Sequence, residues 1–303
     1  MATERRRIGL AVLNWNGREV LPLCLASLEA AADASRHDVS LLLVDNASTD
    51  GSDAWAAGAH PRWEQLPTGA NRRYAGGMNA ALAHLLPRGF DYVAVLNNDV
   101  EADPQLFDPL VADLEAEARR GAAAPRIHYH GARDRIWYGG GEVGRLSRVA
   151  RHLGIRRRAA GRWLAAADTG YLTGCCILGR AEFWKTTGGF DEAFGFYAED
   201  VDLSLRARAL GWRLRYVPDA LLYHRVGWSS GGGFSAAKLR AQRRATALLI
   251  RRHVRPALRP LAHLAWWGRA ACGLAAGLGR GERGLLGSLI RSLRPENRGE
   301  ARP

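Results

Sequence analysis

The sequence predicts an α/β protein with a Rossmann-like sheet flanked by helices, followed by a basic helical tail. Three observations lead to this fold class. Short apolar runs that end in polar residues recur along the first third of the chain, segments with helical spacing lie between them, and positive charge gathers near the C-terminus. Apolar runs that alternate with helices are typical of parallel strands joined by right-handed crossovers.

The three apolar runs are expected to be neighbouring strands of one sheet. They cover residues 8–17, 39–52 and 91–100. They end in Asn14 and Asn16, in Asp45 and Asn46, and in Asn97, Asn98 and Asp99. Ligands of open α/β sheets bind beyond the carboxyl ends of the strands. Asn, Asp and Gly also form ordinary turns after strands, and that alternative fits any single run equally well. Three such ends at one edge favour a binding site.

Two segments between the runs have the spacing of amphipathic helices. Leu21, Leu25 and Leu28 follow one another at steps of four and three, and residues 78–86 repeat the pattern with Met78, Leu82, Leu85 and Leu86. This spacing places the apolar side chains on one face of a helix. The first part of the chain is therefore expected to be a Rossmann-like half.

The next segment, residues 131–168, is rich in Gly and Arg and has no clear periodicity. It is expected to be irregular and to lie over the binding site. Arg156, Arg157 and Arg158 are available there to bind anions, although a solvated basic loop is the default explanation for them.

Residues 171–230 alternate again between strand and helix. We expect a small-residue strand at 173–178, a short helix, a turn at Gly188 and Gly189, a helix from about Asp200 to Leu210, and a strand at 213–218 before His224. Gly211 is a natural stop for the second helix. A lone histidine such as His224 is more often structural than a ligand.

The positive charge lies almost entirely in the tail. The net charge is +13, and from Gly231 onward there are 15 Lys and Arg against 3 Asp and Glu, whereas the preceding residues hold 28 against 27. This distribution argues against nucleic-acid binding over the fold. Residues 261–279 are interrupted by His263 and Arg269, so we expect a basic amphipathic segment on an anionic membrane surface rather than a spanning helix. Packing of the tail on the body is the alternative.

Cysteine usage and the N-terminus point to a reduced, cytoplasmic setting. Cys24, Cys175, Cys176 and Cys272 form no C-x-x-C pair and no cluster with histidines, so the spacing indicates neither a zinc site nor a disulfide framework. The chain passes from charged residues to an apolar run within eight residues, without an apolar stretch of signal-peptide length.

An ordered set of motifs resembles the family 2 glycosyltransferases of the GT-A fold, most closely their rhamnosyltransferase-like branch. The motifs are VLNWNG, LLVDNASTDGS, YAGGMNAAL, VAVLNNDVEADP, the long stretch from TGCCILG to LRYVP, and YHRVGWSS. They span about residues 7–230. The resemblance implies a catalytic domain over residues 1–230, with a donor half to about 120 and an acceptor half from about 121, and a separate tail over 231–303.

The resemblance implies a Mg²⁺ or Mn²⁺ site and a catalytic base. The family's D-x-D motif reads Asn97-Asn98-Asp99 here, which keeps Asp99 as the metal ligand and leaves Asn97 to bind ribose without adding charge. His224 matches a second metal ligand. By family position Asp200 is the base, with Glu199 beside it. Acids at the start of a helix also serve as N-caps or offset the helix dipole. Offsetting the dipole is the only role that we expect of Asp202.

The resemblance also implies a nucleotide site. Asp45 matches the residue that reads the base, and Gly76, Gly77 and Asn79 open a helix where a nucleotide can approach the backbone. Asn14, Asn16 and Asn98 join them from the strand ends. Aromatic residues at 184, 190, 194, 196 and 197 are available to stack on sugars, but core packing is the default expectation.

The expected activity is inverting transfer of a sugar, such as rhamnose or another hexose, from a UDP- or dTDP-sugar to a glycan or lipid-linked hydroxyl. Inversion is expected because the sequence places no second carboxylate as a nucleophile on the sugar. The tail would hold the enzyme on the inner face of the cell membrane. The alternatives are a nucleotidyltransferase on a similar fold and a non-catalytic module that binds membrane or nucleic acid through the tail.

Overall fold

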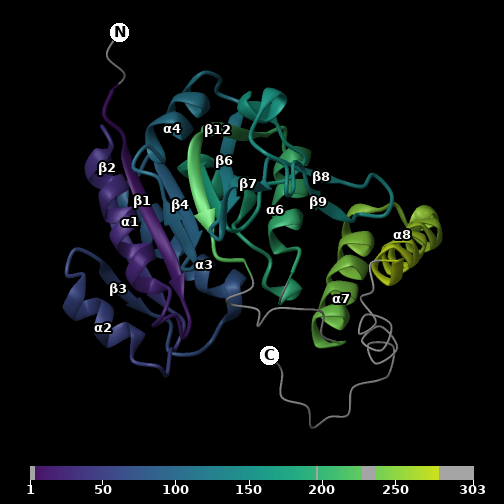
Figure 1. Cartoon of the computed structure of the whole chain (residues 1–303), viewed down its shortest axis with the longest axis horizontal. Coiled ribbons are helices and arrows are strands. Elements are labelled where there is room, and N and C mark those ends of the chain that lie inside the picture. The colour runs from purple at the N-terminus through teal and green to yellow at the C-terminus, as the bar shows by residue number, and fades with distance from the viewer. Residues whose placement is uncertain (1–3, 196, 227–235, 280–303) are drawn as a thin grey trace.

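A computed structural model describes residues 4–195, 197–226 and 236–279. One large mixed sheet runs through the body, with helices on both faces, and a pair of C-terminal helices lies beside it (Figure 1). The α/β class expected from the sequence is confirmed. The strands are β1 (Arg7–Asn14), β2 (Asp38–Asp45), β3 (Glu64–Pro67), β4 (Tyr92–Asn97), β5 (Val100–Ala102), β6 (Arg120–Tyr129), β7 (Ala132–Tyr138), β8 (Gly141–Val143), β9 (Ala150–His152), β10 (Ala167–Asp168), β11 (Cys176–Arg180) and β12 (Arg213–His224).

The helices that connect these strands are α1 (Leu21–Ala34), α2 (Ser52–Ala59), α3 (Arg73–Leu85), α4 (Phe107–Glu115), α5 (Ala181–Thr187) and α6 (Glu199–Ala209). Two longer helices come after them, α7 (Ala236–His253) and α8 (Arg259–Gly279). Leu21, Leu25 and Leu28 of α1 are fully buried, as their spacing predicts. Gly188, Gly189 and Gly211 all have positive φ angles, which explains why glycine stands at these turns.

The N-terminal part of the sheet is parallel and brings its polar strand ends to one edge. The order β3-β2-β1-β4 is parallel throughout. The register sets Asn14 opposite Asp45, and Leu13 opposite Asn97. Asn98 therefore follows β4 at the level at which Asn14 ends β1. The convergence expected from the sequence is a direct result of this register.

The second part of the sheet is mixed. β11 runs antiparallel to both β4 and β6, and β12 runs parallel to β6. β12 also pairs antiparallel with β5, which sets His224 opposite Val100. The long β12 thus places His224 beside Val100, the residue that follows Asp99, although the two are 124 positions apart in the sequence (224 − 100).

Residues 131–168 are more regular than the sequence predicts. They contain β7, which pairs with β6, and the separate hairpin of β8 and β9. Short β10 adds to the edge of the main sheet beside β12. The expectation of an irregular segment is wrong here because these short strands depend on pairing with neighbours, which leaves little periodicity in their own sequence.

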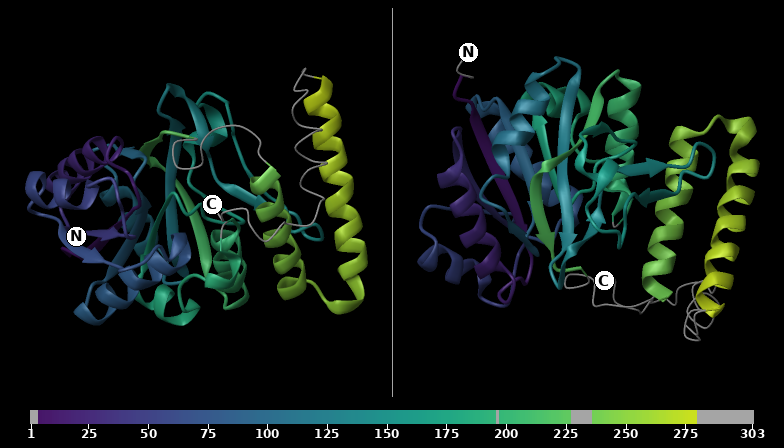
Figure 2. Two further views of the ribbon diagram at one scale, coloured as in Figure 1. Left: turned by 90° about the horizontal axis from the view of Figure 1, so that it is seen from below. Right: turned by 45° about the horizontal axis from the view of Figure 1, so that its top comes forward.

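Helix α7 packs on the body, in line with the alternative stated for the tail. Ala245 and Leu249 belong to the main core, while Ile250 and Val254 meet Ala262 of α8. α8 lies alongside α7 as a hairpin on the side of the body away from β1 and β2 (Figure 2). Residues 227–235, which include the expected domain boundary, and residues 280–303 of the tail lie outside the described residues. None of the helices that the structure describes has the length and apolar character to cross a bilayer.

Asp202 anchors this docking, which corrects the expectation that it only offsets the helix dipole. Its carboxylate is fully buried in α6 and accepts hydrogen bonds from Arg206 Nε at 2.7 Å and from His253 Nε2 of α7, also at 2.7 Å. Burial alone would raise the pKa of Asp202, but these two hydrogen bonds outweigh it and hold the pKa below its ordinary value. A second contact joins Arg252 of α7 to Asp191.

Candidate functional site

Asn14 is the hub of a buried polar network at the ends of β1, β2 and β4. Its Nδ2 donates to Asp45 Oδ1 at 3.2 Å, to Ser48 Oγ at 3.1 Å and to Ser52 Oγ at 2.8 Å. Its Oδ1 accepts from Asn98 Nδ2 at 2.9 Å. Asn14 is fully buried, and Asp45 and Asn98 are nearly so. The strand-end residues expected to converge are therefore hydrogen-bonded to one another.

Gly17 permits this network, a role that no pattern in the sequence assigned to it. A Cβ at this position would lie 2.2 Å from Asn98 Nδ2 and 2.4 Å from Asn14 Oδ1. Any side chain there would break the bond between the two amides. The signal was present in the sequence as a glycine directly after the Asn-Trp-Asn turn.

Asn16 and Asp45 fix the loop that follows β2. Asn16 has a φ of 51°, its N–H donates to Ser48 Oγ at 3.0 Å, and its Oδ1 accepts from Thr49 N at 2.7 Å. Asp45 Oδ2 accepts from Ser48 N at 3.0 Å. The two residues thus lie around one loop, as expected, and Asn16 remains exposed at its rim.

Asn46 fixes the start of α3, another role that the sequence did not predict. Its Oδ1 accepts from Arg72 N at 2.9 Å and Thr68 Oγ1 at 3.1 Å. Its Nδ2 donates to Asn71 Oδ1 and to Arg73 O, both at 3.1 Å. All the bonding capacity of one side-chain amide is used to hold this loop over the ends of β1 and β2.

Gly76, Gly77 and Asn79 have packing partners instead of an open surface. A Cβ on Gly77 would lie 2.4 Å from Leu13 Cδ1, so this glycine lets α3 pack closely on β1. Asn79 donates to Phe190 O at 2.8 Å and accepts from Phe190 N at 2.9 Å. These contacts explain Gly77 and Asn79 without a ligand, and the expected place of all three residues at the nucleotide remains a prediction.

Asp99 and His224 meet at the junction of the two parts of the sheet. Asp99 Oδ1 lies 3.2 Å from His224 Nε2, and the two side chains are 1% and 9% exposed. The backbone fixes the pair, because Arg225 N donates to Asp99 O at 2.8 Å. Trp137 packs edge-on against the His224 ring, with 4.3 Å between centroids. Asn97 is partly exposed beside them.

This pair fits a divalent cation that takes further ligands from a substrate. The part of the chain that the structure describes has no group of three or more His, Cys, Asp or Glu side chains arranged for a metal. A carboxylate oxygen and an imidazole nitrogen are nevertheless suitable ligands for Mn²⁺ and, for the oxygen, Mg²⁺. Mg²⁺ at phosphate-transfer sites typically keeps only one or two carboxylates and completes its shell with substrate oxygens and water.

Asp200 is held at the start of α6 by backbone donors. Its Oδ2 accepts from Gly174 N at 2.9 Å and its Oδ1 from Val201 N at 2.8 Å. The helix N-cap is Ala198, so Asp200 lies inside the first turn and is not the N-cap. Burial raises the pKa of Asp200 above its ordinary value, and the two hydrogen bonds offset only part of this effect.

Glu199 is a carboxyl group without a hydrogen-bonding partner for its buried Oε2. Burial, followed by repulsion from Asp200, raises its pKa to about 8. Tyr197 and Ala198, directly before it, have φ angles of 75° and 68°. Left-handed conformations in two consecutive non-glycine residues are strained and recur at functional sites. Backbone strain and the desolvation of both carboxyl groups therefore accompany the placement of Glu199 and Asp200 side by side.

The segment 173–176 joins the two acidic centres. Gly174 N donates to Asp200, while Cys175 O accepts from Asn97 N at 3.2 Å. Tyr74 Oη donates to Gly174 O at 2.6 Å and holds the segment from the other side. Asp200 and the strand end that carries Asp99 are therefore bound to consecutive residues of one turn. The aromatic side chains at 184, 190 and 194 are buried core, in agreement with the default expectation, and Phe196 lies outside the described residues.

Glu199→Gln should change how stability depends on pH. Glu199 keeps its proton to about pH 8 in the folded state, whereas an unfolded glutamate loses it near 4.5. The free energy of unfolding of the wild-type protein should therefore fall as the pH rises through this window. The fall should be smaller in the variant, and the difference between the two should exceed about 1 kcal/mol. Urea unfolding at pH 5 and pH 8 measures this, with the exposed Glu182→Gln as control. Parallel pH profiles for wild type and Glu199→Gln would contradict it.

Family models match most of the chain. The model described as glycosyl transferase family 2 matches residues 10–186, and a second, glycosyl transferase family group 2, matches residues 148–281. Among curated proteins, an N-acetylglucosaminyl-diphospho-decaprenol L-rhamnosyltransferase of Mycobacterium tuberculosis is 31% identical over 268 residues, which is 80% of each chain. An uncharacterized protein, y4gI, of Sinorhizobium fredii is 29% identical over 71% of this chain and 24% of its own length.

Solved structures share the fold at low identity. The mannosyltransferase PcManGT of Pyrobaculum calidifontis, in complex with GDP-Man and Mn²⁺, is 18% identical with a TM-score of 0.60, over 96% of this chain and 86% of that one. GalNAc-T7 with UDP, GalNAc and Mn²⁺ is 15% identical with a TM-score of 0.59, over 80% of this chain and only 48% of its own. Likeness at this level bears on the fold alone, and it confirms the fold class expected from the sequence.

Proposed function

The chain belongs to glycosyltransferase family 2, and from this we propose that it transfers a sugar from a nucleoside-diphosphate sugar to a hydroxyl of a glycan or lipid-linked acceptor with inversion. One observation carries the proposal. The strand end with Asp99 and the helix start with Asp200 are hydrogen-bonded to neighbouring residues of the segment 173–176. In this arrangement Asp99 would hold a cation at the leaving diphosphate and Asp200 would take the proton of the acceptor, with the reacting sugar between them.

The donor half, residues 1 to about 120, would bind the nucleotide along the ends of β1, β2 and β4. Asp45, with Asn14 and Asn16, would face the base and ribose of a UDP- or dTDP-sugar, and Asn98 completes their network. Asn97 keeps an amide at the edge of this region that can bind a ribose hydroxyl. Rhamnose is the proposed sugar, since the mycobacterial relative is named a rhamnosyltransferase.

Asp99 and His224 would hold the Mg²⁺ or Mn²⁺ ion. When bound, the cation stabilises the negative charge that develops on the departing diphosphate. Their side chains lie 3.2 Å apart before any ion is considered, so one ion can contact both with little rearrangement. The backbone bond from Arg225 N to Asp99 O keeps the two strands in this register.

Asp200 would act as the base of the acceptor half, from about residue 121 to 230. The acceptor oxygen attacks the anomeric carbon, the bond from that carbon to the diphosphate breaks, and the hydroxyl proton passes to Asp200. A raised pKa suits this role, because a more basic carboxylate takes a proton more readily. Glu199 would position the acceptor and tune Asp200. Family membership favours this reaction over the nucleotidyltransferase and non-catalytic alternatives.

A screen of sugar nucleotides tests the proposal directly. Ligands that bind only the native state raise the melting temperature. We expect dTDP- or UDP-sugars to protect the protein in Mn²⁺ and to lose most of that effect in EDTA. The protecting donor should then be consumed when an acceptor is added. Failure of every nucleoside-diphosphate sugar to protect the protein would count against the assignment.

We propose further that α8 rests on the anionic inner face of the cell membrane, where a lipid-linked acceptor would be found. Leu261, Leu264 and Trp267 are 52%, 67% and 42% exposed. Exposed Arg255 and Arg269 lie along the same hairpin. Apolar side chains flanked by arginines are the usual means by which a helix lies in the headgroup region. Because α7 packs on the body, α8 is the helix of this hairpin that is available for the contact.

Leu264→Glu with Leu261→Glu should release the protein from liposomes containing anionic lipid, while activity on a water-soluble acceptor is retained. The substitutions remove apolar area and add repulsion at two side chains that are 52% and 67% exposed. Flotation with vesicles of phosphatidylglycerol and phosphatidylcholine measures the effect. Ala257→Glu, exposed but outside α8, is the matched control. Undiminished flotation of the double variant would refute the contact.

A further inference from the structure

Two adjacent residues at the end of α7 bind the acidic segment, residues 191–202, which contains the proposed base. Arg252 forms an ion pair with Asp191 at the start of the segment. His253 Nε2 lies 2.7 Å from Oδ1 of Asp202 at its end. The last turn of α7 is therefore fixed to the acidic segment at two points, one on each side of the carboxyl groups that the proposed reaction needs.

Asp202 and Asp200 lie on opposite faces of α6. Successive residues of an α-helix are turned by about 100°, so residues two positions apart are turned by about 200°. Asp200 accepts a hydrogen bond from Gly174 N on the side of the segment 173–176, whereas Asp202 accepts one from His253 on the side of α7. The first turn of α6 is thus bound on one face to the segment 173–176 and on the other to α7.

The carboxylate of Asp202 depends on His253 for one of its two side-chain donors. It is fully buried, and its other donor is Arg206 Nε at 2.7 Å. Arg206 is itself fixed, because it also donates to Gly189 O at 2.8 Å. Loss of the His253 ring would leave one oxygen of a buried carboxylate without a donor, which is costly. The first turn of α6 would have to move for that oxygen to find a new partner.

The backbone directly before α6 is strained. Tyr197 and Ala198 both have positive φ angles, and such conformations persist only where the surrounding contacts enforce them. The first hydrogen bond of α6 runs from Asp202 N to Ala198 O at 2.9 Å. A contact that fixes Asp202 therefore also fixes the strained residues that precede Glu199 and Asp200.

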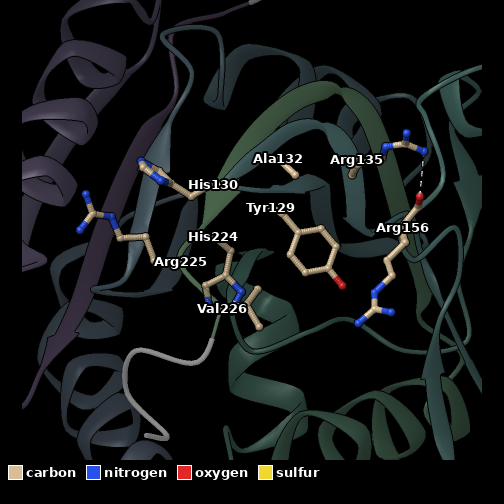
Figure 3. Close-up of a pocket in the computed structure, with 9 residues that line it drawn as sticks. Tyr129, His130, Ala132, Arg135, Arg156, His224, Arg225 and Val226 are labelled. Atoms are coloured by element: carbon tan, nitrogen blue, oxygen red, sulfur yellow. Dashed lines mark hydrogen bonds between the residues drawn. The ribbon is translucent and has the colours of Figure 1, made fainter. Parts of the chain in front are cut away.

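His253 does not line the cleft beside His224. This cleft has a volume of about 890 Å³, and its lining includes Tyr129, His224 and Arg225 but, among the described residues, none from α7 or α8 (Figure 3). His253 is therefore not placed to contact a substrate there. We expect it to act through the carboxylate that it binds.

We propose that His253, assisted by Arg252, is a positioning residue that holds the first turn of α6 where Asp200 can take the proton of the acceptor. The inference rests on the proposed role of Asp200 as the base. It gives α7 a part in the reaction, because the helix is bound directly to the one that carries the base. The end of α7 is in turn fixed to the body, since Arg148 of the β8–β9 hairpin donates to His253 O.

His253→Ala should lower the rate at saturating donor and acceptor about tenfold, as expected for the loss of a hydrogen bond to a buried carboxylate, and leave the KM for the donor unchanged. His253→Gln should keep most of the wild-type rate, since its amide N–H can donate to the same oxygen. Arg251→Ala is the matched control, because Arg251 is an exposed cation in the same turn of α7. The assays use the full chain and a water-soluble acceptor. A wild-type rate in His253→Ala, or equal losses in the alanine and glutamine variants, would overturn the proposal.

A double-mutant cycle separates the positioning of Asp200 from a general loss of structure. If His253 acts through Asp200, His253→Ala should cause no further loss of rate in the Asp200→Asn background. A purely structural effect would lower the rate by the same factor in both backgrounds, and that result would count against a positioning role.

Amide hydrogen exchange distinguishes failure of this inference from failure of the proposed function. The N–H of Gly174 donates to Asp200, so its exchange reports on the position of α6 whether or not sugar is transferred. We expect faster exchange in residues 171–176 and 199–204 of His253→Ala, with no change in β1 and β2. If wild type transfers no sugar but this exchange depends on His253, the proposed function fails and the positioning of α6 stands. If wild type transfers sugar and neither exchange nor rate responds to His253, the positioning role fails alone.

Discussion

Asp200→Asn is expected to lower the rate of sugar transfer at least about 100-fold, with little change in donor affinity. The amide still accepts a hydrogen bond from Gly174 N, so the segment 173–176 should keep its position. What the variant loses is the ability to accept a proton from the acceptor hydroxyl. Turnover at saturating donor and acceptor measures the first effect, and donor protection against thermal unfolding measures the second.

Asp219→Asn is a matched control for this experiment, because Asp219 is an exposed carboxylate of β12. It should behave as wild type in both measurements. A wild-type rate for Asp200→Asn would remove Asp200 from the role of base. A fall in rate accompanied by an equal fall in donor affinity would mean that Asp200 positions the segment without taking the proton.

Most of the donor side could be predicted from the sequence because it depends on a simple repeat. Apolar strands that end in polar residues recur in β1, β2 and β4, and parallel pairing then aligns Asn14 with Asp45 by register. No knowledge of distant contacts was required. The role of Gly17 was not predicted, and Asn46 was expected only as a polar strand end, because both roles depend on the shape of loops, where a Cβ distance or four hydrogen bonds decide the outcome.

The acceptor side was less predictable because its residues take their roles from partners far along the chain. Asp202 has the pattern of a first-turn acid, but its partner His253 lies 51 residues away. The same limit applies to Asn79 in the donor half, which has the pattern of a residue open to a nucleotide, yet Phe190, 111 residues away, occupies its amide. Local periodicity also failed for β7 to β9, since their stability comes from pairing and not from an apolar pattern of their own.

Asp99 and His224, the proposed metal ligands, show what the sequence pattern and the structure contribute separately. From its spacing alone, His224 is expected to be an ordinary structural histidine. Only the resemblance to the family predicts that it is a metal ligand. In the structure, the pairing of β12 with β5 brings it to 3.2 Å from Asp99. Asn97 in place of an acid means that the site has one carboxylate where the family motif offers two. The affinity for the cation should therefore depend strongly on Asp99.

Asp99→Asn is accordingly expected to lower kcat/KM at least about 100-fold and to abolish the difference in donor protection between Mn²⁺ and EDTA. The reason is that the amide brings no charge to a hard cation, while its shape preserves the buried packing around it. Asn97→Asp tests the same physics in the opposite direction, because a second carboxylate should lower the Mn²⁺ concentration required for half-maximal protection. Activity is measured across a Mn²⁺ titration, with circular dichroism to verify that each variant is folded. Metal-dependent protection that survives in a folded Asp99→Asn would mean that the cation is held elsewhere, and the assignment of Asp99 and His224 would have to be abandoned.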